Sequence, residues 1–218
     1  MASRIPRGAR KLVAALRARC YVACVWDQLH ILSPVAETLA ERGAEVKLIV
    51  GPTHLSIHHP RIERIDILSA REMYDACMTH FPQCDGAILS AAVADFRPAN
   101  ASDIKIKKQN DTDGMTLQLV QNPDILASLG KSKQAHQVLV GFALETNNEI
   151  AHAQTKLEKK NLDFIVLNSL RDKGAGFGTD TNKITIIQRD GTIEEGTLKT
   201  KREVASDIVD KLVERLSR

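Results

Sequence analysis

Residues 85–93 read Asp85-Gly-Ala-Ile-Leu-Ser-Ala-Ala-Val93, an apolar run without the polar alternation of a half-exposed strand. Such a run predicts a buried parallel strand. Further short apolar strands are expected at Glu45–Val50, Ile62–Leu68, Gln137–Phe142 and Leu162–Leu167. Helices are expected between them at Ala70–Phe81 and Asn147–Lys160. This alternation predicts an α/β fold with a Rossmann-like, doubly wound, mostly parallel sheet.

Two turn-rich stretches interrupt the alternation of strands and helices. Short strands at Ile104–Lys108 and Met115–Val120 flank a turn at Asn110–Gly114, which predicts an antiparallel hairpin extension. A second hairpin is expected over residues 183–198, with its turn at Arg189-Asp190-Gly191, before a closing helix at Lys201–Leu216.

Composition excludes several classes of protein. The 218 residues are 43% hydrophobic and 26% charged, as expected for one soluble globular domain. No apolar run approaches the ~20 residues needed to cross a membrane. The four cysteines form no Cys-x-x-Cys pair, which favours reduced thiols and a cytoplasmic location.

The basic charge is confined to the beginning of the chain. The net charge is +3, residues 1–36 carry +5, and the remaining 182 residues therefore carry −2. The main part of the chain is thus not expected to bind nucleic acid. Residues 1–35 also contain Trp26 and two of the four cysteines, a composition unlike the rest. The regular pattern begins with a helix end over Ala36–Arg42, stopped by Gly43.

Candidate ligand-binding residues follow the predicted strands, because open α/β sheets bind ligands beyond their carboxyl ends. Asp95 and Arg97 come after the run at 85–93 and suit contacts to a sugar hydroxyl or a phosphate, or form a solvated pair. Lys105 and Lys107 would share one face of a strand. They suit a polyphosphate or an acyl-phosphate intermediate, or merely protect a sheet edge.

Three further segments suit a nucleotide. Asn122-Pro-Asp-Ile125 begins a helix, with Asn122 as the expected N-cap; its backbone faces a nucleotide or only starts the helix. Phe142 stacks on a base or belongs to the core. Lys156 and Lys160 share one helical face and bind phosphates or lie in solvent. The glycine-rich stretch at Gly174–Asn182 fits neither the P-loop nor the dinucleotide pattern, and is a loop over a site or a connector.

Six motifs in this order resemble the phosphopantothenate–cysteine ligase domain over about residues 36–217. They are VADFRP, KIKK, NPDIL, VGFALET, KLEKKNLDFIVLN and GFGTDTN. In most bacteria this domain is the C-terminal half of a bifunctional coenzyme A biosynthesis flavoprotein with an N-terminal decarboxylase. The resemblance implies a CTP-dependent enzyme that also needs Mg²⁺. CTP would activate 4′-phosphopantothenate as an acyl-cytidylate, and cysteine would then displace CMP.

The resemblance also implies a set of site residues. The CTP site would contain Asp95, Lys105, Pro123, Asp124, Ile125, Leu126, Phe142, Lys156 and Lys160. Lys105 would also be catalytic in the turnover of the acyl-cytidylate; metal ligands are not assigned. Homodimers are implied, with the hairpin at Ile104–Val120 reaching the partner's active site. FMN would bind only to a decarboxylase domain, which is absent from this sequence and is a candidate partner.

The sequence departs from the family at its beginning. The family opens with a strand into Gly-Gly-Thr-x-Glu, then Asp-Pro-Val-Arg and Asn-His-Ser-Ser-Gly-x-Met-Gly, whereas this chain has no glycine between Gly8 and Gly43. We therefore interpret residues 1–35 as a frame-shifted or mispredicted segment; a targeting peptide is the alternative. Loss of the first strand would leave the sheet centre under-packed, and loss of the glycine turn would impair catalysis.

Two other functions are weighed against the ligase. A nicotinamide-dependent reductase would need G-x-G-x-x-G after the first strand, which is absent. A non-catalytic remnant would dimerise and bind nucleotide without turnover, and an activity assay would distinguish it from the ligase.

Overall fold

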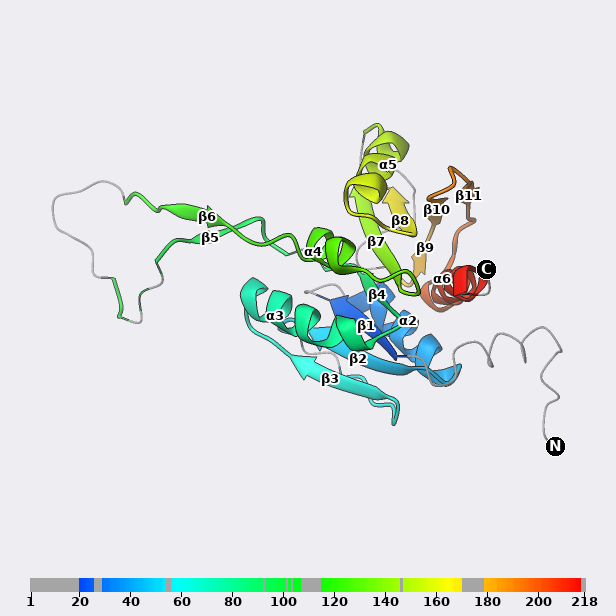
Figure 1. The fold of residues 1–218 in the computed structure, drawn as a ribbon, viewed down its shortest axis with the longest axis horizontal. Helices are drawn as coiled ribbons and strands as arrows, with labels where there is room; N and C mark the ends of the chain where they lie inside the picture. Colours follow the sequence, from blue (N-terminus) through cyan, green and yellow to red (C-terminus); the bar gives the residue numbers. More distant parts are fainter. Residues whose placement is uncertain are drawn as a thin grey trace.

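The computed structural model describes residues 20–25, 29–53, 56–91, 93–100, 102, 104–106, 115–145, 147–169 and 179–216. Its central sheet has eight strands in the order β11-β10-β8-β7-β4-β1-β2-β3 (Figure 1). The six strands from β8 to β3 pair in parallel, and β10 and β11 add an antiparallel edge. In chain order the parallel strands are arranged 3-2-1-4-5-6, as in the Rossmann fold. The sheet strands are β1 (Cys20–Val25), β2 (Glu45–Val50), β3 (Ile62–Asp66), β4 (Gly86–Leu89), β7 (Val138–Glu145), β8 (Phe164–Ser169), β10 (Ile184–Gln188) and β11 (Ile193–Glu195).

Helices cover both faces of this sheet. One buried cluster joins α2 and α6 to the sheet, and a second joins α3, α4 and α5 to the opposite face. The helices are α2 (Leu29–Glu41), α3 (Ala70–His80), α4 (Ile125–Ser132), α5 (Glu149–Lys159) and α6 (Lys201–Leu216), with a 3₁₀ turn, η1, at Phe81–Gln83. The predicted closing helix is confirmed residue for residue. The expected mixed α/β fold with a mostly parallel sheet is also confirmed.

Strand β1 corrects the expectation for the beginning of the chain. Residues 20–25, Cys-Tyr-Val-Ala-Cys-Val, pair in parallel with β2 on one side and β4 on the other. Tyr21 is fully buried, as are Leu32 and Val35 on α2. A central strand needs only apolar residues that fit a covered sheet, so the predicted loss of the first strand is wrong. That residues 1–35 are frame-shifted or mispredicted stays a prediction.

The hairpin extension forms with a different pairing from the one expected. The antiparallel pair is β5 (Phe96–Pro98) with β6 (Leu119–Gln121), next to the body of the protein. Residues 104–106 and 115–118 are described but lie in no strand, and Leu119 and Val120 pair with β5, so the described residues do not form the predicted pairing of Ile104–Lys108 with Met115–Val120. The rest of that prediction, residues 107–108 and the turn at 110–114, lies outside the described residues. The close pairing is favoured because the shared clamp at Asn122 holds both strands where they leave the body. Figure 1 shows this arm projecting away from the sheet.

The second predicted hairpin is confirmed as β10 and β11. Gly191 allows its turn, since its φ of 87° lies in the left-handed region that favours glycine. A further short pair joins β9 (Thr181–Asn182) to β12 (Lys199–Thr200), which leads directly into α6. Residues 174–178 of the predicted glycine-rich loop lie outside the described residues.

Candidate functional site

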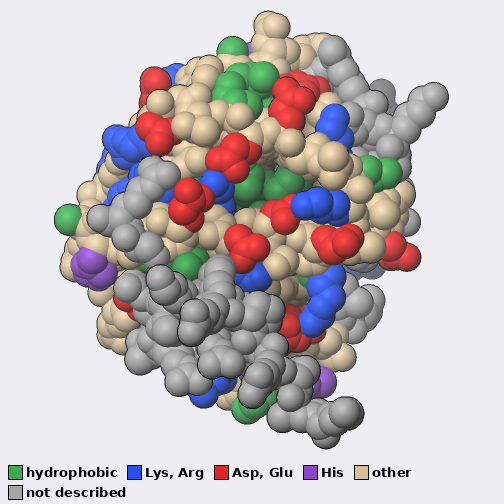
Figure 2. All heavy atoms as spheres, turned by 90° about the vertical axis from the view of Figure 1, so that its right-hand side faces the viewer, with side chains coloured by type: hydrophobic (Ala, Val, Ile, Leu, Met, Phe, Trp, Pro, Cys, Tyr) green, Lys and Arg blue, Asp and Glu red, His purple; other side chains and the backbone are tan. Residues whose placement is uncertain are grey.

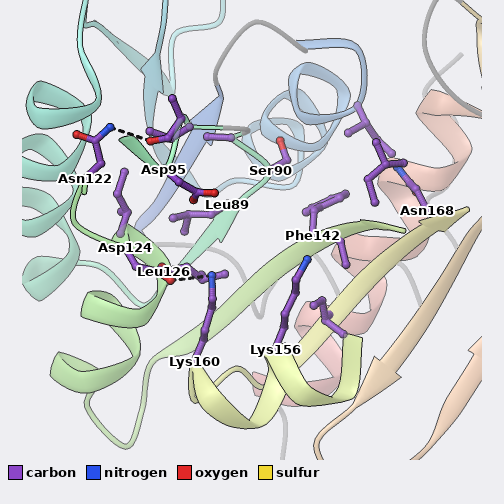
Figure 3. Close-up of a pocket in the computed structure, with 18 of the residues that line it drawn as sticks. Leu89, Ser90, Asp95, Asn122, Asp124, Leu126, Phe142, Lys156, Lys160 and Asn168 are labelled. Atoms are coloured by element: carbon purple, nitrogen blue, oxygen red, sulfur yellow. Dashed lines mark hydrogen bonds and ion pairs between the residues drawn. The ribbon is translucent and has the colours of Figure 1, made fainter. Parts of the chain in front are cut away.

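A cavity of about 440 Å³ lies beyond the carboxyl ends of β4 and β7 (Figure 3). This is next to the point where the strand order reverses, between β1 and β4, the usual ligand position in open α/β sheets. Of the nine predicted nucleotide-binding residues, eight line this cavity. They are Asp95, Pro123, Asp124, Ile125, Leu126, Phe142, Lys156 and Lys160.

One wall of the cavity is held by Asn122, which is only 8% exposed. Its Nδ2 donates to the Ala94 carbonyl at 2.7 Å, and its backbone N–H donates to the Asp95 carbonyl at 2.7 Å. Its Oδ1 accepts from Arg97, which also donates to the Gln121 carbonyl. Within the described residues Arg97 thus joins the two strands of the arm and forms no ion pair with Asp95. The exposed carboxylate of Asp95 is left facing the cavity.

Asp124, rather than Asn122, is the N-cap of α4. Its Oδ1 accepts from the Ala127 N–H at 2.9 Å, and α4 begins at Ile125. The predicted cap at Asn122 is wrong because that side chain is used to hold the preceding loop. Asp124 Oδ2 also pairs with Lys160 at 2.9 Å, so the helix start and α5 are joined across the cavity.

Lys156 on α5 and Lys160, the residue directly after α5, both reach the cavity, as their four-residue spacing predicts (Figure 3). Lys156 pairs with Glu145 at the end of β7 at 2.6 Å, and His152 lies 3.5 Å from the same carboxylate. The hydrogen bond from Lys156 lowers the pKa of Glu145. These carboxylates orient the two ammonium groups. A phosphate that binds here must therefore share or replace a carboxylate partner.

Apolar side chains form the middle of the cavity. Phe142 on β7 is partly buried and lies between Asn122 and Asn168 in the view of Figure 3. Leu89 and Ile165 line the cavity from the neighbouring strands. A flat aromatic ring beside apolar groups can accept a nucleobase by stacking.

Lys105 is the predicted residue that the cavity lacks. It lies on the arm, exposed, and does not line the cavity of its own chain. Lys107 and Lys108 lie outside the described residues.

Five polar lining residues were not predicted from the sequence: Ser90, Gln121, Asn168, Asn182 and Lys201. Ser90 Oγ is buried and has no hydrogen-bond partner among the described residues. Ser90 and Asn168 lie at the carboxyl ends of β4 and β8, where open α/β sheets bind ligands, so their position after apolar runs could have predicted them. No sequence pattern brings Asn182 and Lys201 to the same cavity, because short β9–β12 pairing places them there.

The charged side chains and the potential metal ligands of the described residues bear on which ligands the site could bind. Basic and acidic side chains are interspersed on the face shown in Figure 2. No described helix is long and apolar enough to cross a membrane. Across the described ranges, no cluster of three or more His, Cys, Asp or Glu side chains could hold a metal ion. The site combines cations, carboxylates and an aromatic ring, and can bind an anionic ligand with an apolar or aromatic part.

The fold and the cavity define an open α/β protein with a candidate ligand site at the carboxyl edge of a Rossmann-like sheet. The chain belongs to the DNA/pantothenate metabolism flavoprotein C-terminal domain family, which it matches over residues 33–216. The resemblance seen in the sequence is thereby confirmed at the level of the family.

Relatives and solved structures agree with this assignment. The chain is 51% identical over 179 residues to a protein of an unknown prokaryotic organism named as a cysteine/cysteine sulfinic acid decarboxylase, covering 82% of this chain and 49% of that protein. It is 42% identical over 178 residues to the coenzyme A biosynthesis bifunctional protein CoaBC of Bacillus subtilis (strain 168), covering 82% and 43%. The chain thus spans about half the length of these relatives.

Among solved structures, the C-terminal domain of a coenzyme A biosynthesis bifunctional protein CoaBC matches with a TM-score of 0.77 at 30% identity. The match covers 93% of this chain and 98% of that one. A DNA/pantothenate metabolism flavoprotein from Streptococcus pneumoniae matches with a TM-score of 0.72 at 20% identity, covering 89% and 98%, and supports the fold alone.

Proposed function

We propose that this chain is a ligase domain of coenzyme A biosynthesis that joins 4′-phosphopantothenate to cysteine with CTP. The observation that carries the proposal is the cavity, which brings together eight residues that the family resemblance implies for CTP. They come from segments far apart in the sequence, after β4, at the start of α4, on β7 and on α5. The names of the CoaBC relatives support the same pathway. We also propose that the sheet is doubly wound, which the strand order and the helices on both faces support.

In this proposal each wall of the cavity has a separate role. Lys156 and Lys160 bind nucleotide phosphates, and their carboxylate partners hold them in position before binding. Phe142 stacks on the base. Asp95 accepts a hydrogen bond from a ribose hydroxyl.

The proposed reaction has two steps. The carboxylate of 4′-phosphopantothenate attacks the α-phosphate of CTP, which forms an acyl-cytidylate and releases pyrophosphate. The amine of cysteine then attacks the acyl carbon and releases CMP. The chain positions both reactants, and its lysines offset the negative charge that develops on the phosphate and carbonyl oxygens.

The residues that line this cavity fit a Mg²⁺ ion bound together with the nucleotide phosphates. Proteins commonly hold this ion through one or two carboxylates together with substrate phosphates and water. Asp95 and Asp124 are carboxylates that line the cavity, so a dedicated cluster of protein ligands is not required. When bound, the ion would neutralise phosphate charge.

Lys105 is proposed to act in the cavity of a second copy of the chain. The arm that carries it is exposed and apolar, which supports burial against a partner. The exposed apolar residues of the arm are Phe96, Ile104, Ile106, Met115, Leu117 and Leu119. A homodimer, a separate decarboxylase partner and a cytoplasmic location all remain proposals.

The test is a coupled pyrophosphate assay with CTP, 4′-phosphopantothenate, cysteine and Mg²⁺. Pyrophosphate release that needs 4′-phosphopantothenate, followed by CMP release that needs cysteine, is the expected result. CTP binding without either release would favour the non-catalytic remnant.

We also propose that the beginning of the chain lowers turnover, since it lacks a glycine-rich turn that could approach phosphate closely. A variant in which residues 1–35 are replaced by a family-like segment should turn over faster. Equal rates for the two chains would contradict this second proposal and leave the ligase assignment intact.

A further inference from the structure

Lys201 is a third lysine that lines the cavity, at the opposite end of the sequence from the predicted motifs. It is the first residue of α6. The cavity lysines Lys156 and Lys160 each pair with a carboxylate, at 2.6 and 2.9 Å. Lys201 differs, because its Nζ has no ion-pair partner in the described part of the chain.

The surroundings of Lys201 disfavour an isolated ammonium group. Burial lowers the pKa of this lysine, and the nearby Asp180 carboxylate opposes the shift only in part. The positive end of the α6 dipole is a further unfavourable neighbour for a cation. A partly desolvated cation that forms no ion pair costs free energy, and a bound anion would recover part of that cost.

Two asparagines add hydrogen-bond donors at the same end of the cavity. Asn182 is 3% exposed, and its Nδ2 donates to Asn168 Oδ1 at 3.4 Å while its own Oδ1 accepts from the Lys183 N–H at 2.9 Å. This arrangement fixes the amide of Asn168. Its Nδ2 is left without an acceptor among the described residues, and it lines the cavity. An ammonium and a free amide N–H₂ together offer donors only, which is the chemistry that a phosphate oxygen requires.

Asn168 lies on the far side of Phe142 from Asn122 (Figure 3). Asn168 is at the end of β8, on the outer side of β7, and Asn122 lies beyond β4 on the other side. Figure 3 shows Asn122 and Asn168 at opposite ends of the cavity, with Phe142 between them. A ligand that spans the cavity would therefore meet a second set of donors beyond the aromatic ring.

We propose that Asn168, Asn182 and Lys201 form a second phosphate-binding subsite of this cavity. The proposal deepens the proposed function and rests on it only for the identity of the ligand. Two substrates of the proposed reaction carry phosphate, CTP and 4′-phosphopantothenate. The shared ligand is thus a phosphate group, bound by the Lys201 ammonium with the Asn168 amide, which Asn182 orients.

The test is titration calorimetry on the full chain and on Lys201→Gln, with inorganic triphosphate, CTP and 4′-phosphopantothenate as separate probes. Loss of one charged hydrogen bond should weaken triphosphate binding by roughly 10- to 100-fold. If Lys201→Gln binds CTP more weakly but binds 4′-phosphopantothenate as tightly as wild type, the subsite holds a nucleotide phosphate. The opposite pattern assigns it to 4′-phosphopantothenate. Cytidine and pantothenate, which lack phosphate, should bind equally to both chains.

Two further variants separate the role of the charge from other effects. Lys199→Gln makes the same change of charge two residues earlier, but Lys199 pairs with Asp207 and does not line the cavity, so binding should be unchanged. Lys201→Arg keeps the charge and should retain most of the affinity. Equal binding by wild type and Lys201→Gln, or an equal loss in Lys199→Gln or Lys201→Arg, would overturn the subsite.

The outcomes also distinguish this proposal from the ligase assignment. Triphosphate binding that depends on Lys201, in a chain that forms no product, would support the subsite and contradict the ligase. If Lys201→Gln keeps the ligase activity and the phosphate affinity of wild type, the ligase assignment would be supported and the subsite contradicted. A wild-type chain that binds none of the three phosphate compounds would overturn both.

Discussion

Replacing Gly130 with alanine would test how α4 supports the cavity. Gly130 packs directly on the turn after α5, and a Cβ at this position would lie 2.0 Å from the Lys160 carbonyl oxygen and 2.8 Å from its carbon. Ordinary van der Waals contact begins at 3.4 Å, so α4 and the turn would have to separate by more than an ångström. The Gly130 carbonyl also accepts from Asn161 Nδ2 at 2.8 Å, and this bond would stretch with the separation.

Helix propensity and packing predict opposite signs for Gly130→Ala. Propensity alone would stabilise the protein by about 1 kcal/mol, because alanine is the better helix former. Overpacking against a backbone carbonyl typically costs about 1–3 kcal/mol. We expect packing to dominate, since neither contacting atom is on a flexible side chain. A Cβ only 2.0 Å from a backbone oxygen places this cost in the upper part of the range, about 2–3 kcal/mol. The net loss is then about 1–2 kcal/mol and should lower Tm by roughly 2–8 °C in a chain of this length.

Thermal unfolding followed by circular dichroism measures this effect, with Lys131→Ala as the control. Lys131 is the exposed neighbour on the same helix, and its replacement should change stability by less than about 0.5 kcal/mol. CTP affinity should fall in Gly130→Ala, because the shifted turn carries Lys160. A Tm equal to or above that of wild type would refute the reasoning about this contact.

Three further predictions concern the cavity and the arm. Calorimetry should show tighter binding of CTP than of ATP, as the family resemblance of the site implies; equal or tighter ATP binding would contradict it. Lys105→Ala should slow the second half-reaction by about 10²–10³-fold and let acyl-cytidylate accumulate, which mass spectrometry of quenched reactions would detect. Near-normal turnover would exclude that role. Because Lys156 lowers the pKa of Glu145, their pair stabilises the fold above the ordinary carboxyl pKa of 4.5, and this stabilisation is lost as pH falls through the lowered value. The loss of stability in Glu145→Gln, measured by urea unfolding, should therefore be larger at neutral pH than well below pH 4.5; an equal difference at both would show that the pair does not contribute.

The strands and helices that repeat a clear pattern could be predicted from the sequence. The amphipathic stretch at 201–216 forms α6 over its whole length, and the centre of the apolar run at 85–93 forms the buried strand β4 at Gly86–Leu89, so local pattern and final environment agree there. The run was predicted too long, because its described residues after Leu89 lie outside the sheet and line the cavity. The arm could be predicted only in part. Its turn residues marked a hairpin, but the pairing depends on the Arg97–Asn122 clamp, which joins residues 25 positions apart.

The segment 20–25 shows a different kind of error. Its departure from the family's opening motifs led to the expectation of a missing strand, yet Cys20–Val25 pairs with β2 and β4. A strand between two others needs a short apolar run and little else, because the neighbouring backbones supply the hydrogen bonds. The absence of the family's opening motifs therefore does not prevent a strand from forming at this position.

The sequence by itself determined the fold class, the family and eight of the residues that line the cavity, because these depend on local patterns and ordered motifs. Only the tertiary structure decided how the cavity is closed. Strand order brings Asn168, and the β9–β12 pair brings Lys201, to the cavity that Phe142 lines. The ion pair of Lys160 with Asp124 joins the end of α5 to the start of α4. The pairing of charged side chains depends on contacts between elements that are far apart in the sequence. No local sequence pattern encodes those contacts. For that reason the exposed Lys105 was found from its motif, whereas Lys201 was found only from its place in the fold.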